Sequence, residues 1–464
     1  MDKKLLLVLP RNERGYWGKV TNGKAGFVRL SLPAVAALTP DDWQVAIHDA
    51  RADPVDYDRE VDLVGITAFT AEIPSAYSIA DTFRKRGVPV VIGGVHVSAL
   101  PQEGLEHADA VVVGEAEGVW GTLLRDLEAG ELQRVYRGEE LCDMRQMKIP
   151  RRDLLNREMY VACFNTVQAT RGCPFDCDFC AVTGVFGRKF RTRPIGEVVD
   201  EIRAFDTRDF FFVDDNICGN SAYAKELFHA IAPLKKTWGG QTSITFARDT
   251  ELLELYARSG GRYAFVGFES ISEEGLAGIN KKWNHADAYA DAIQRIHDAG
   301  INILGSFIFG LDGEDVSVFQ RTLDFIMEHR LDAAHFNILT PFPGTRLFET
   351  LESEGRILER DWAKYHTSEV VFKPMKMSVE DLQNGFYRVF RETYSFRNIL
   401  KRTFRSWRGI PYRLAMNYSY RKKAMRMPST TTGQKETPSR VSPAPVHSRA
   451  SRPVCDRKSV SLPR

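Results

Sequence analysis

At 464 residues the chain is longer than one ordinary domain, so two or three domains are expected. Hydrophobic residues make up 43% and charged residues 27%, which is a normal globular balance, and the net charge of +2 does not point to a polyanionic partner. The opening apolar run is too short for a signal peptide, and no stretch approaches the roughly 20 apolar residues of a membrane-spanning helix. We therefore expect a soluble, cytoplasmic protein.

Residues 1–135 alternate short apolar runs with helical patterns such as Ser75–Arg86. The predicted strands are Leu5–Leu9, Gln44–His48, Leu63–Thr67, Val88–Ile92 and Ala110–Val113. Five such units predict an α/β fold with a doubly wound parallel sheet and helices on both faces. Ligands bind beyond the carboxyl ends of such strands, which carry Thr67, Gly93, Gly94, Gly114 and Glu115. Glycines there suit a bulky or phosphate-bearing ligand, although tight turns alone would also explain them.

A second alternating series follows a connector at residues 136–165. Over residues 166–345 it predicts helices such as Ile195–Phe205 and Ala222–Ala232, and strands at Asn165–Ala169, Asp209–Val213, Thr242–Ala247, Tyr263–Gly267, Asn302–Phe309 and Ala334–Leu339. That spacing indicates a partial or full (β/α) barrel, in which reactive groups sit at the carboxyl ends of the strands. A helical C-terminal extension is predicted over residues 346–396, and a basic segment with a disordered tail over residues 397–464.

Three of the seven cysteines lie within eight residues, as Cys173, Cys177 and Cys180 in CxxxCxxC spacing after a predicted strand. Thiolates so close in sequence can wrap one metal centre, and soft sulfur ligands favour zinc or iron–sulfur. No fourth Cys or His follows at once to close a zinc site, so three thiolates on a four-iron cube would leave one iron open. Zinc completed by a distant residue, or inert buried cysteines, are the alternatives.

CxxxCxxC after the first strand of a (β/α) barrel resembles the radical S-adenosylmethionine superfamily. The resemblance implies a 4Fe–4S cluster whose open iron chelates S-adenosylmethionine, and a 5′-deoxyadenosyl radical made by reductive cleavage. Phe179 matches the aromatic residue that this family places near the adenine. A reduced flavodoxin or ferredoxin is the kind of electron donor that the resemblance implies.

Other strand ends supply further candidates for binding S-adenosylmethionine. Asp214, Asp215 and Asn216 follow a strand where the family often carries a Gly-Gly-Glu-like stretch, although a helix N-cap would explain them too. Glu269 and Gly310 end two later strands, where they could meet ribose, substrate or adenine. Arg248 could pair with a carboxylate or form a surface ion pair.

The turn from Pro341 to Thr345 resembles a motif of radical enzymes that carry an N-terminal cobalamin-binding domain. The resemblance assigns Thr67, Gly93, Gly94, Gly114 and Glu115 to cobalamin, and implies methylation of an unactivated carbon in a small-molecule, lipid or pigment substrate. Ring formation, rearrangement or oxidation are the alternatives within the family. The DxHxxG element is absent, so neither His48 nor His96 is expected to ligate cobalt.

Two rival functions remain open on the sequence. A tRNA or protein methylthiotransferase would need three more N-terminal cysteines, yet none precedes Cys142. A zinc-dependent nucleic-acid-binding protein would use the basic segment, where Arg397 to Arg426 holds ten Lys or Arg, no Asp or Glu, and aromatic residues. The same segment could instead contact a membrane surface, or be a solvated tail; nucleic acid is the least expected partner.

Overall fold

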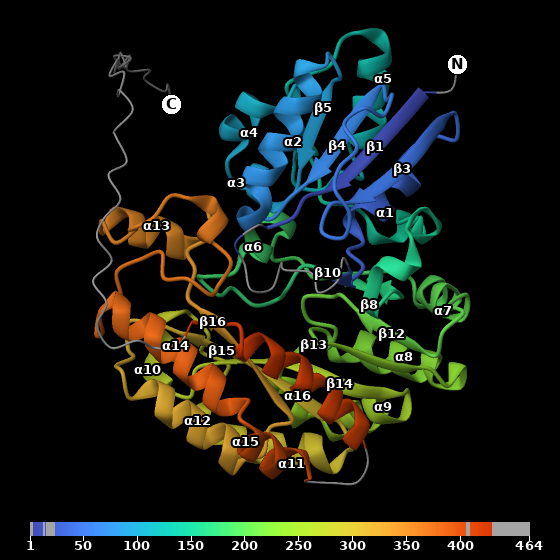
Figure 1. The fold of residues 1–464 in the computed structure, drawn as a ribbon. Coiled ribbons are helices and arrows are strands. Elements are labelled where there is room, and N and C mark those ends of the chain that lie inside the picture. Colours follow the sequence, from blue (N-terminus) through green and yellow to red (C-terminus); the bar gives the residue numbers. More distant parts are fainter. Residues whose placement is uncertain (1–2, 13, 15–23, 405–408, 429–464) are drawn as a thin grey trace, which may run out of the picture. The chain divides into compact units, whose positions relative to one another are not determined.

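The computed structural model describes residues 3–12, 14, 24–404 and 409–428 (Figure 1). Residues 1–428 form one compact unit. The tail predicted to be disordered lies outside the described residues from residue 429 onward. Within the described part of the chain, no helix combines the length and apolarity needed to cross a bilayer.

The first sheet has six parallel strands in the order β3-β1-β4-β5-β6-β7. They are β1 Lys3–Leu9, β3 Trp43–Asp49, β4 Leu63–Thr67, β5 Val90–Gly93, β6 Ala110–Val113 and β7 Val135–Arg137. All five predicted strands are confirmed. The sixth, β7, was not predicted, because three residues at the edge of a sheet leave too short an apolar run to recognise.

Helices cover both faces of this sheet, as predicted (Figure 1). One hydrophobic cluster packs one face against α1 Ser31–Leu38 and α5 Trp120–Ala129. The other packs the opposite face against α2 Ile73–Lys85, α3 Val95–Ala99 and α4 Pro101–His107, with the short 3-10 helix η1 Thr70–Glu72 before α2. The strand order reverses between β1 and β4, so the carboxyl ends of these strands form the switch point where doubly wound sheets bind ligands.

The connector has structure of its own. It contains the 3-10 helices η2 Met144–Gln146, η3 Arg152–Leu154 and η4 Arg157–Met159. It ends in β8 Tyr160–Cys163, which pairs with β2 Ala25–Phe27 in a two-stranded parallel sheet. The division of the chain into five segments stays a prediction.

The second sheet also has six parallel strands, in the order β16-β15-β14-β13-β12-β9. They are β9 Thr166–Val167, β12 Asp209–Phe212, β13 Thr237–Ser243, β14 Gly261–Glu269, β15 Asn302–Phe309 and β16 Ala333–Ile338. Among the described residues β9 and β16 remain its edges, so the barrel is partial. A separate antiparallel pair, β10 Thr170–Arg171 with β11 Arg191–Thr192, flanks the cysteine loop.

One strand of this sheet lies five residues before its predicted place. The stretch Thr242–Ala247 mostly forms the 3-10 helix η6 Ile244–Arg248, and β13 precedes it. The prediction followed the apolar residues of that turn, whereas β13 carries Gly239 and Gly240 instead. A Cβ atom at Gly239 would stand 3.0 Å from the Tyr263 side chain, and one at Gly240 would stand 3.2 Å from the Phe212 side chain. The position of β13 therefore depends on close packing against its neighbours, which the apolar pattern of the sequence does not record.

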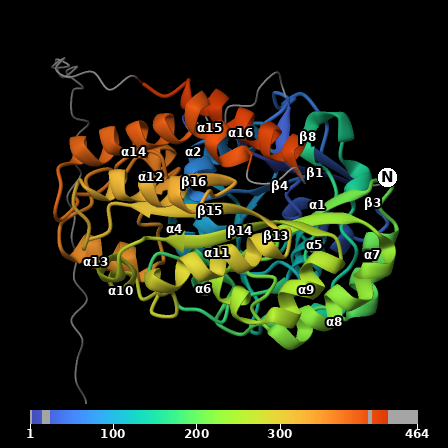
Figure 2. The same cartoon turned by 90° about the horizontal axis from the view of Figure 1, so that it is seen from below.

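Helices return the chain between the strands and cover the outer face of the sheet (Figure 2). They are α7 Ile195–Arg203, α8 Ser221–Ile231, α9 Thr250–Arg258, α10 Glu273–Gly278, α11 Tyr289–Asp298 and α12 Val318–Glu328, with the 3-10 helices η5 Ala232–Leu234 and η7 Ala286–Ala288. The short helix α6 Ala181–Phe186, which follows the cysteine loop, has no buried residue. Phe212, Trp238 and Phe268 are buried in this layer. The inner-face residues of the same strands are only half-buried, among them Tyr263, Phe265, Leu304 and His335.

After the barrel the chain continues in a group of helices. The group contains α13 Arg346–Ser353, η8 Trp362–Lys364 and α14 Val379–Thr393. Two further helices, α15 Phe396–Thr403 and α16 Ile410–Ala424, fall within the predicted basic segment. Arg402 and Arg413 are buried there, so part of this segment is folded rather than a solvated tail.

Candidate active site at the cysteine loop

The three cysteines occupy one short loop between β10 and α6, at the carboxyl end of the first barrel strand. Gly172, directly before Cys173, has φ +83°, and a Cβ there would stand 2.5 Å from the carbonyl oxygen of Lys189. Only glycine fits both constraints. At the other end, Cys180 is the residue from which α6 starts. The loop path is therefore fixed at both ends, and all three thiols are free of disulfides.

The three cysteines are half-buried in a shared environment. Burial raises the pKa of Cys177 to about 12 and that of Cys180 to about 11, and neighbouring thiolates add to both shifts. Burial likewise raises the pKa of Cys173. Such thiols give up their protons to metal rather than to water, so cluster assembly on this loop releases protons.

The three free cysteines of this loop form the kind of donor set that holds a four-iron cube, because thiolates are the usual ligands of iron–sulfur clusters. Cys173, Cys177 and Cys180 would hold three corners of such a cube and leave the fourth open.

Arg346 fastens the cysteine loop from the start of α13. Its guanidinium donates to Asp178 Oδ1 at 2.8 Å, to Asp176 Oδ1 at 2.9 Å and to the Asp176 carbonyl oxygen at 2.7 Å. Thr345 caps the same helix by accepting from the Phe348 amide. The Pro341–Thr345 turn noted in the sequence thus delivers an arginine to the loop that carries the cysteines.

A second segment, residues 279–284, packs on the cysteine loop and was missed by the sequence analysis. The Asp178 amide donates to the Ile279 carbonyl at 3.2 Å, and the Asn280 side chain donates to the Asp176 carbonyl at 2.8 Å. The rings of Trp283 and Phe175 stack with centroids 4.1 Å apart. No sequence motif marks this segment as part of the site. Only its contacts with the cysteine loop in the folded chain show that it belongs there.

Glu269 lies beside the cysteines in a strained backbone. Its φ is +63°, which is rare for a residue with a side chain and is found at functional sites. Its carboxylate accepts from Lys281 Nζ at 2.5 Å, and both side chains are buried. The positive charge of Lys281 lowers the pKa of Cys177 against the effect of burial. Lys281, from the segment 279–284, is a further site residue that the sequence did not reveal.

The structure separates the three neighbours Asp214, Asp215 and Asn216. Asp214 accepts hydrogen bonds from the amides of Ala169 and Thr170 and from the Thr170 hydroxyl, so it holds the strand that enters the cysteine loop. Burial raises its pKa to about 7 in spite of these bonds. The Asn216 side-chain oxygen accepts from the Ser243 amide and the Thr242 hydroxyl, at 3.4 and 3.5 Å.

Asp215 alone keeps a buried carboxylate oxygen, Oδ2, without a partner among the described residues. Burial raises the pKa of Asp215 to about 6, although the charge of Arg171 lowers it. The Asp215 carboxylate also raises the pKa values of Cys173 and Cys180, which places it near their sulfur atoms. An unpartnered carboxylate beside an open iron fits the ammonium group of S-adenosylmethionine.

Two other predicted residues have apolar surroundings. Phe179 is partly buried and packs on the hydrophobic core of the barrel. Gly310 has φ +94°, and a Cβ there would stand 2.7 Å from the Leu382 side chain. The roles of Phe179, Asp214, Asp215, Asn216, Glu269 and Gly310 in binding S-adenosylmethionine stay predictions.

Four of the residues predicted to bind cobalamin lie together where the first sheet ends, at the carboxyl ends of β4, β5 and β6. Gly93 pairs with Thr67, and Gly94 has φ +103° with its Cβ position 2.9 Å from Thr67 Oγ1. The Gly114 amide donates to the Ser98 hydroxyl at 2.9 Å. Phe69, just beyond β4, is half exposed at this edge. A backbone rim with an exposed aromatic ring fits a large planar ligand such as cobalamin.

His96 and His48, the two histidines considered above for cobalt, both make contacts within the protein. His96 is buried, and its Nε2 lies 3.2 Å from Glu103 Oε1, which also accepts from Trp362. His48 Nε2 lies 2.9 Å from the Asp53 carbonyl oxygen. The Nε2 atom of each histidine therefore has a partner within the protein, whereas the buried Nδ1 of His96 has none among the described residues.

Glu115 is used differently from the four residues beside it. Its carboxylate pairs with Arg171 at 2.8 Å and Arg191 at 2.8 Å, and accepts from the Cys142 amide at 2.6 Å. Burial raises the pKa of Glu115, but hydrogen bonds from Arg191 and Arg171 outweigh it and leave the pKa below its ordinary value. Glu115 thus joins the first sheet to both strands that flank the cysteine loop, and its role toward cobalamin stays a prediction.

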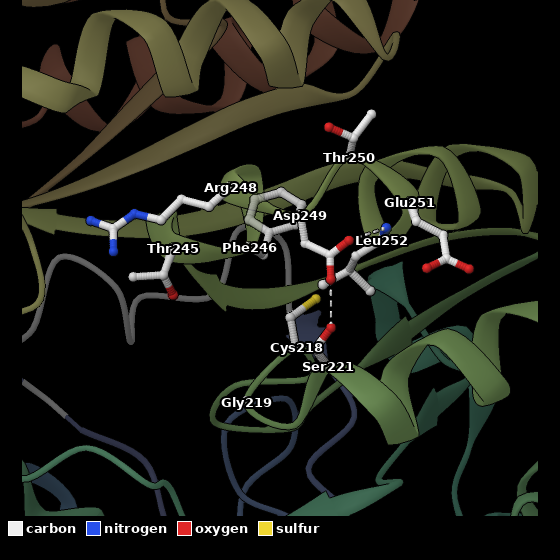
Figure 3. A pocket seen from close by; sticks show the side chains of 10 residues that line it. All are labelled: Cys218, Gly219, Ser221, Thr245, Phe246, Arg248, Asp249, Thr250, Glu251 and Leu252. Atoms are coloured by element: carbon white, nitrogen blue, oxygen red, sulfur yellow. Dashed lines mark hydrogen bonds between the residues drawn. The ribbon is translucent and has the colours of Figure 1, made fainter.

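A pocket of about 640 Å³ opens at the carboxyl ends of β12 and β13 (Figure 3). It is lined by Cys218, Gly219, Ser221, Thr245, Phe246, Arg248, Asp249, Thr250, Glu251 and Leu252. The Ser221 hydroxyl points at the Asp249 carboxylate, and Arg248 extends away from this pair. The Arg248 guanidinium donates to the Trp283 carbonyl at 3.3 Å, which links the pocket to the segment on the cysteine loop.

Three family models match the chain. A radical S-adenosylmethionine superfamily model matches residues 167–326, and a B12-binding domain model matches residues 24–124. A domain of unknown function, DUF4070, matches residues 345–431 and so covers α13 to α16. The first two matches fall on the barrel and on the first sheet, and they agree with the cofactors predicted from the sequence.

Two relatives come from Chlorobaculum tepidum. The chain is 35% identical to a bacteriochlorophyllide d C-12(1)-methyltransferase over 86% of this chain and 89% of the relative. It is 29% identical to a bacteriochlorophyllide d C-8(2)-methyltransferase over 81% and 87% of the two chains.

A solved structure shares the fold. The radical S-adenosylmethionine methyltransferase TsrM from Kitasatospora setae, with cobalamin and a [4Fe–4S] cluster bound, has a TM-score of 0.60 at 18% identity, over 76% of this chain and 78% of that one. Neither the zinc-dependent nucleic-acid-binding alternative nor the methylthiotransferase alternative agrees with these relatives. The chain belongs to the cobalamin-dependent radical S-adenosylmethionine methyltransferases.

Proposed function

We propose that this enzyme methylates an unactivated carbon of a flat, largely apolar pigment or lipid. The observation that carries the proposal is a three-thiolate loop with an unpartnered Asp215 oxygen beside it, in a chain that also holds a cobalamin-type sheet. Two relatives that modify a bacteriochlorophyllide support the pigment class.

The cofactors would supply radical cleavage of S-adenosylmethionine and a transferable methyl group. The residues of this chain bind and orient them. Cys173, Cys177 and Cys180 hold the cluster, and the Asp215 carboxylate accepts from the ammonium group of S-adenosylmethionine. Lys281 and Glu269 neutralise each other beside them, so the site gains no net charge from this pair.

The inner face of the barrel sheet suits an apolar substrate. Tyr263, Phe265 and Leu304 lie on that face, and the Phe265 ring is 5.9 Å from that of His335. Burial lowers the pKa of His335 to about 3, so its ring stays neutral at physiological pH. The aromatic rings of this face can stack against planar rings, and the ammonium group of Lys423 adds a positive charge beside His335.

Arg248 gives the proposed substrate a polar end. It lines the pocket at the mouth of the barrel, and its guanidinium is exposed. A carboxylate on the substrate would accept two parallel hydrogen bonds from the Arg248 guanidinium. Arg248→Gln should raise the KM for a carboxylated acceptor about tenfold and leave kcat nearly unchanged. A kcat loss without a KM change would assign Arg248 another role.

The radical step is tested first on the cysteines. Alanine at position 173, 177 or 180 should abolish the brown iron–sulfur absorbance and all release of 5′-deoxyadenosine from anaerobically reduced protein. Cys163→Ala and Cys218→Ala are matched controls, because both residues are half-buried cysteines outside the loop. Full iron content in any of the three loop variants would contradict the assignment.

Methyl transfer is tested separately with bacteriochlorophyllide d as the acceptor. The reduced enzyme, reconstituted with hydroxocobalamin, should add one methyl group from S-adenosylmethionine, as measured by mass spectrometry. 5′-Deoxyadenosine formed together with a cyclised or oxidised product, and no methylated one, would replace methylation with another radical outcome.

The electron donor, the compartment and a membrane contact are further parts of this proposal. Reduced flavodoxin or ferredoxin would supply the electron, and the cytoplasm would be the place of action. A peripheral contact of residues 397–426 with a membrane would bring the enzyme to a lipid-soluble substrate.

A further inference from the structure

Helices α15 and α16 expose an unusual share of apolar side chains. Seven of the sixteen large apolar side chains exposed in the described part of the chain lie between residues 396 and 425: Phe396, Leu400, Phe404, Tyr412, Leu414, Tyr418 and Met425. Phe396 is 67% exposed and Tyr418 is 59% exposed. Scattered exposed apolar residues are normal, whereas a concentration of them marks an interaction surface.

These side chains form stripes along the two helices. Phe396 and Leu400 are four residues apart on α15 and therefore share a face. Leu414, Tyr418 and Met425 fall within about 40° of one another around α16, at 100° per residue. The two stripes adjoin, because the Arg421 guanidinium of α16 lies 3.7 Å from the centre of the Phe396 ring.

Basic residues border both stripes. Arg397 and Lys401 are exposed on α15, and Lys422 and Arg426 are exposed at the end of α16. Lys422 Nζ lies 4.6 Å from the centre of the Tyr418 ring. No Asp or Glu occurs between residues 397 and 426, so nothing within the segment neutralises these charges. Aromatic rings edged by Lys and Arg are suited to the headgroup region of an anionic bilayer.

The opposite side of α16 meets the inner face of the barrel. The Tyr412 ring packs 5.0 Å from that of Tyr263, and the Tyr420 hydroxyl lies 3.1 Å from His335 Nδ1. One helix therefore carries the exposed stripe and touches the face proposed for the substrate. We propose that α15 and α16 form a docking surface for an anionic lipid bilayer. The docking specifies the membrane contact named in the proposed function; it does not depend on methyl transfer, and only its use for substrate delivery rests on that reaction.

Vesicle co-sedimentation of the full chain tests the docking without any cofactor. The probes are vesicles of phosphatidylcholine alone and vesicles with about 30% phosphatidylglycerol. The wild-type chain should bind the anionic vesicles and lose most of that binding at high salt. The triple variant Phe396→Ser, Leu400→Ser, Tyr418→Ser should bind the anionic vesicles at least about tenfold more weakly. It removes apolar area that the bilayer would bury, and it removes no charge.

The matched control changes apolar residues that are equally exposed elsewhere. Leu358→Ser with Met375→Ser, at 55% and 61% exposure, should leave vesicle binding unchanged. In a charge variant, Lys401→Gln with Lys422→Gln should weaken binding by about fivefold per residue on anionic vesicles alone. Basic residues beyond Pro428 are present in every variant and cancel in the comparison.

The outcomes divide cleanly. Equal binding by the wild type and the triple variant would overturn the docking surface. If the wild type binds no vesicles but forms a dimer that the triple variant does not form, the stripe contacts a second copy of the chain. If the wild type binds only a single-stranded oligonucleotide, the stripe contacts nucleic acid. Either outcome would overturn the proposal. Vesicle binding by an enzyme that methylates no pigment would leave the docking intact and remove only the proposed methyl transfer.

Discussion

At the scale of single residues, buried polar groups decide what each strand end can do. Asp214, Asp215 and Asn216 are neighbours in sequence, but only Asp215 keeps a buried oxygen without a partner among the described residues. The other two are used by the backbone of adjacent strands. A carboxylate that is fully hydrogen-bonded within the protein stabilises it, whereas one left open is available to a ligand.

Glu314 makes the stability of the fold depend on pH. Its carboxylate accepts from the Ser270 hydroxyl at 2.6 Å, and burial raises its pKa from 4.5 to about 7. A raised pKa means that the protonated form favours the fold. This contribution is complete below about pH 4.5 and is lost as the pH rises through about 7. Glu314→Gln, which mimics the neutral form, should therefore gain about 3 kcal/mol over the wild type at pH 8 and little at pH 4.

Urea unfolding at both pH values measures this difference. Glu254→Gln, an exposed change on α9, should shift stability equally little at both. A Glu314→Gln effect that is the same at pH 4 and pH 8 would show that the carboxyl is not titrating as described.

At the scale of secondary-structure elements, α15 is anchored by a basic residue rather than repelled by it. Arg402 is buried and donates to the carbonyls of Leu331 and Thr393 at 3.0 and 2.9 Å. Arg402→Met should lower the free energy of unfolding by about 3 kcal/mol, because these acceptors lose their donors. The exposed Arg397→Met should change it by less than about 0.5 kcal/mol. Chemical denaturation compares the two, and equal effects would mean that α15 does not depend on the buried arginine.

The segment 279–284 is predicted to protect the cluster. Trp283→Ala removes the stack on Phe175, so the cysteine loop should open more often and the reconstituted cluster should bleach in air several-fold faster. Trp283→Phe, which keeps a ring there, should stay close to the wild type. Loss of absorbance over time measures this, and identical rates for wild type and Trp283→Ala would remove the protective role.

At the scale of the whole molecule, Glu115 joins the first sheet to the β10–β11 pair beside the cysteine loop, through Arg171 and Arg191. Glu115→Gln keeps the size of the side chain but leaves the buried Arg191 without its charged partner, at a cost of about 3–5 kcal/mol, whereas Arg171 keeps its ion pair with Glu117 at 2.8 Å. The sheets should then unfold in two calorimetric steps, or at a clearly lower common temperature. Asp143→Asn, which breaks the exposed pair with Arg145, should cost no more than about 1 kcal/mol. A Glu115→Gln chain as stable as the wild type would show that other contacts hold the sheets together.

The sequence by itself determined the two sheets, the cysteine loop and the cofactors. Strands such as Leu63–Thr67 and Asn302–Phe309 were predicted at their observed bounds, because apolar runs ended by polar or turn-forming residues carry their own signal. The CxxxCxxC spacing is local for the same reason: three thiolates within eight residues need no distant partner to identify them. The strand β13 was misplaced because its glycines serve packing against other strands.

Only the tertiary structure decided which polar residues are available for chemistry. Lys281 and Trp283 reach the cysteine loop from more than 100 residues away in the chain, and no local pattern records that approach. Likewise, Glu115 was predicted beside a ligand, yet its partners Arg171 and Arg191 lie on strands of another layer. Periodicity and spacing describe what a residue does to its own element, whereas desolvation and hydrogen bonding depend on what the fold places next to it.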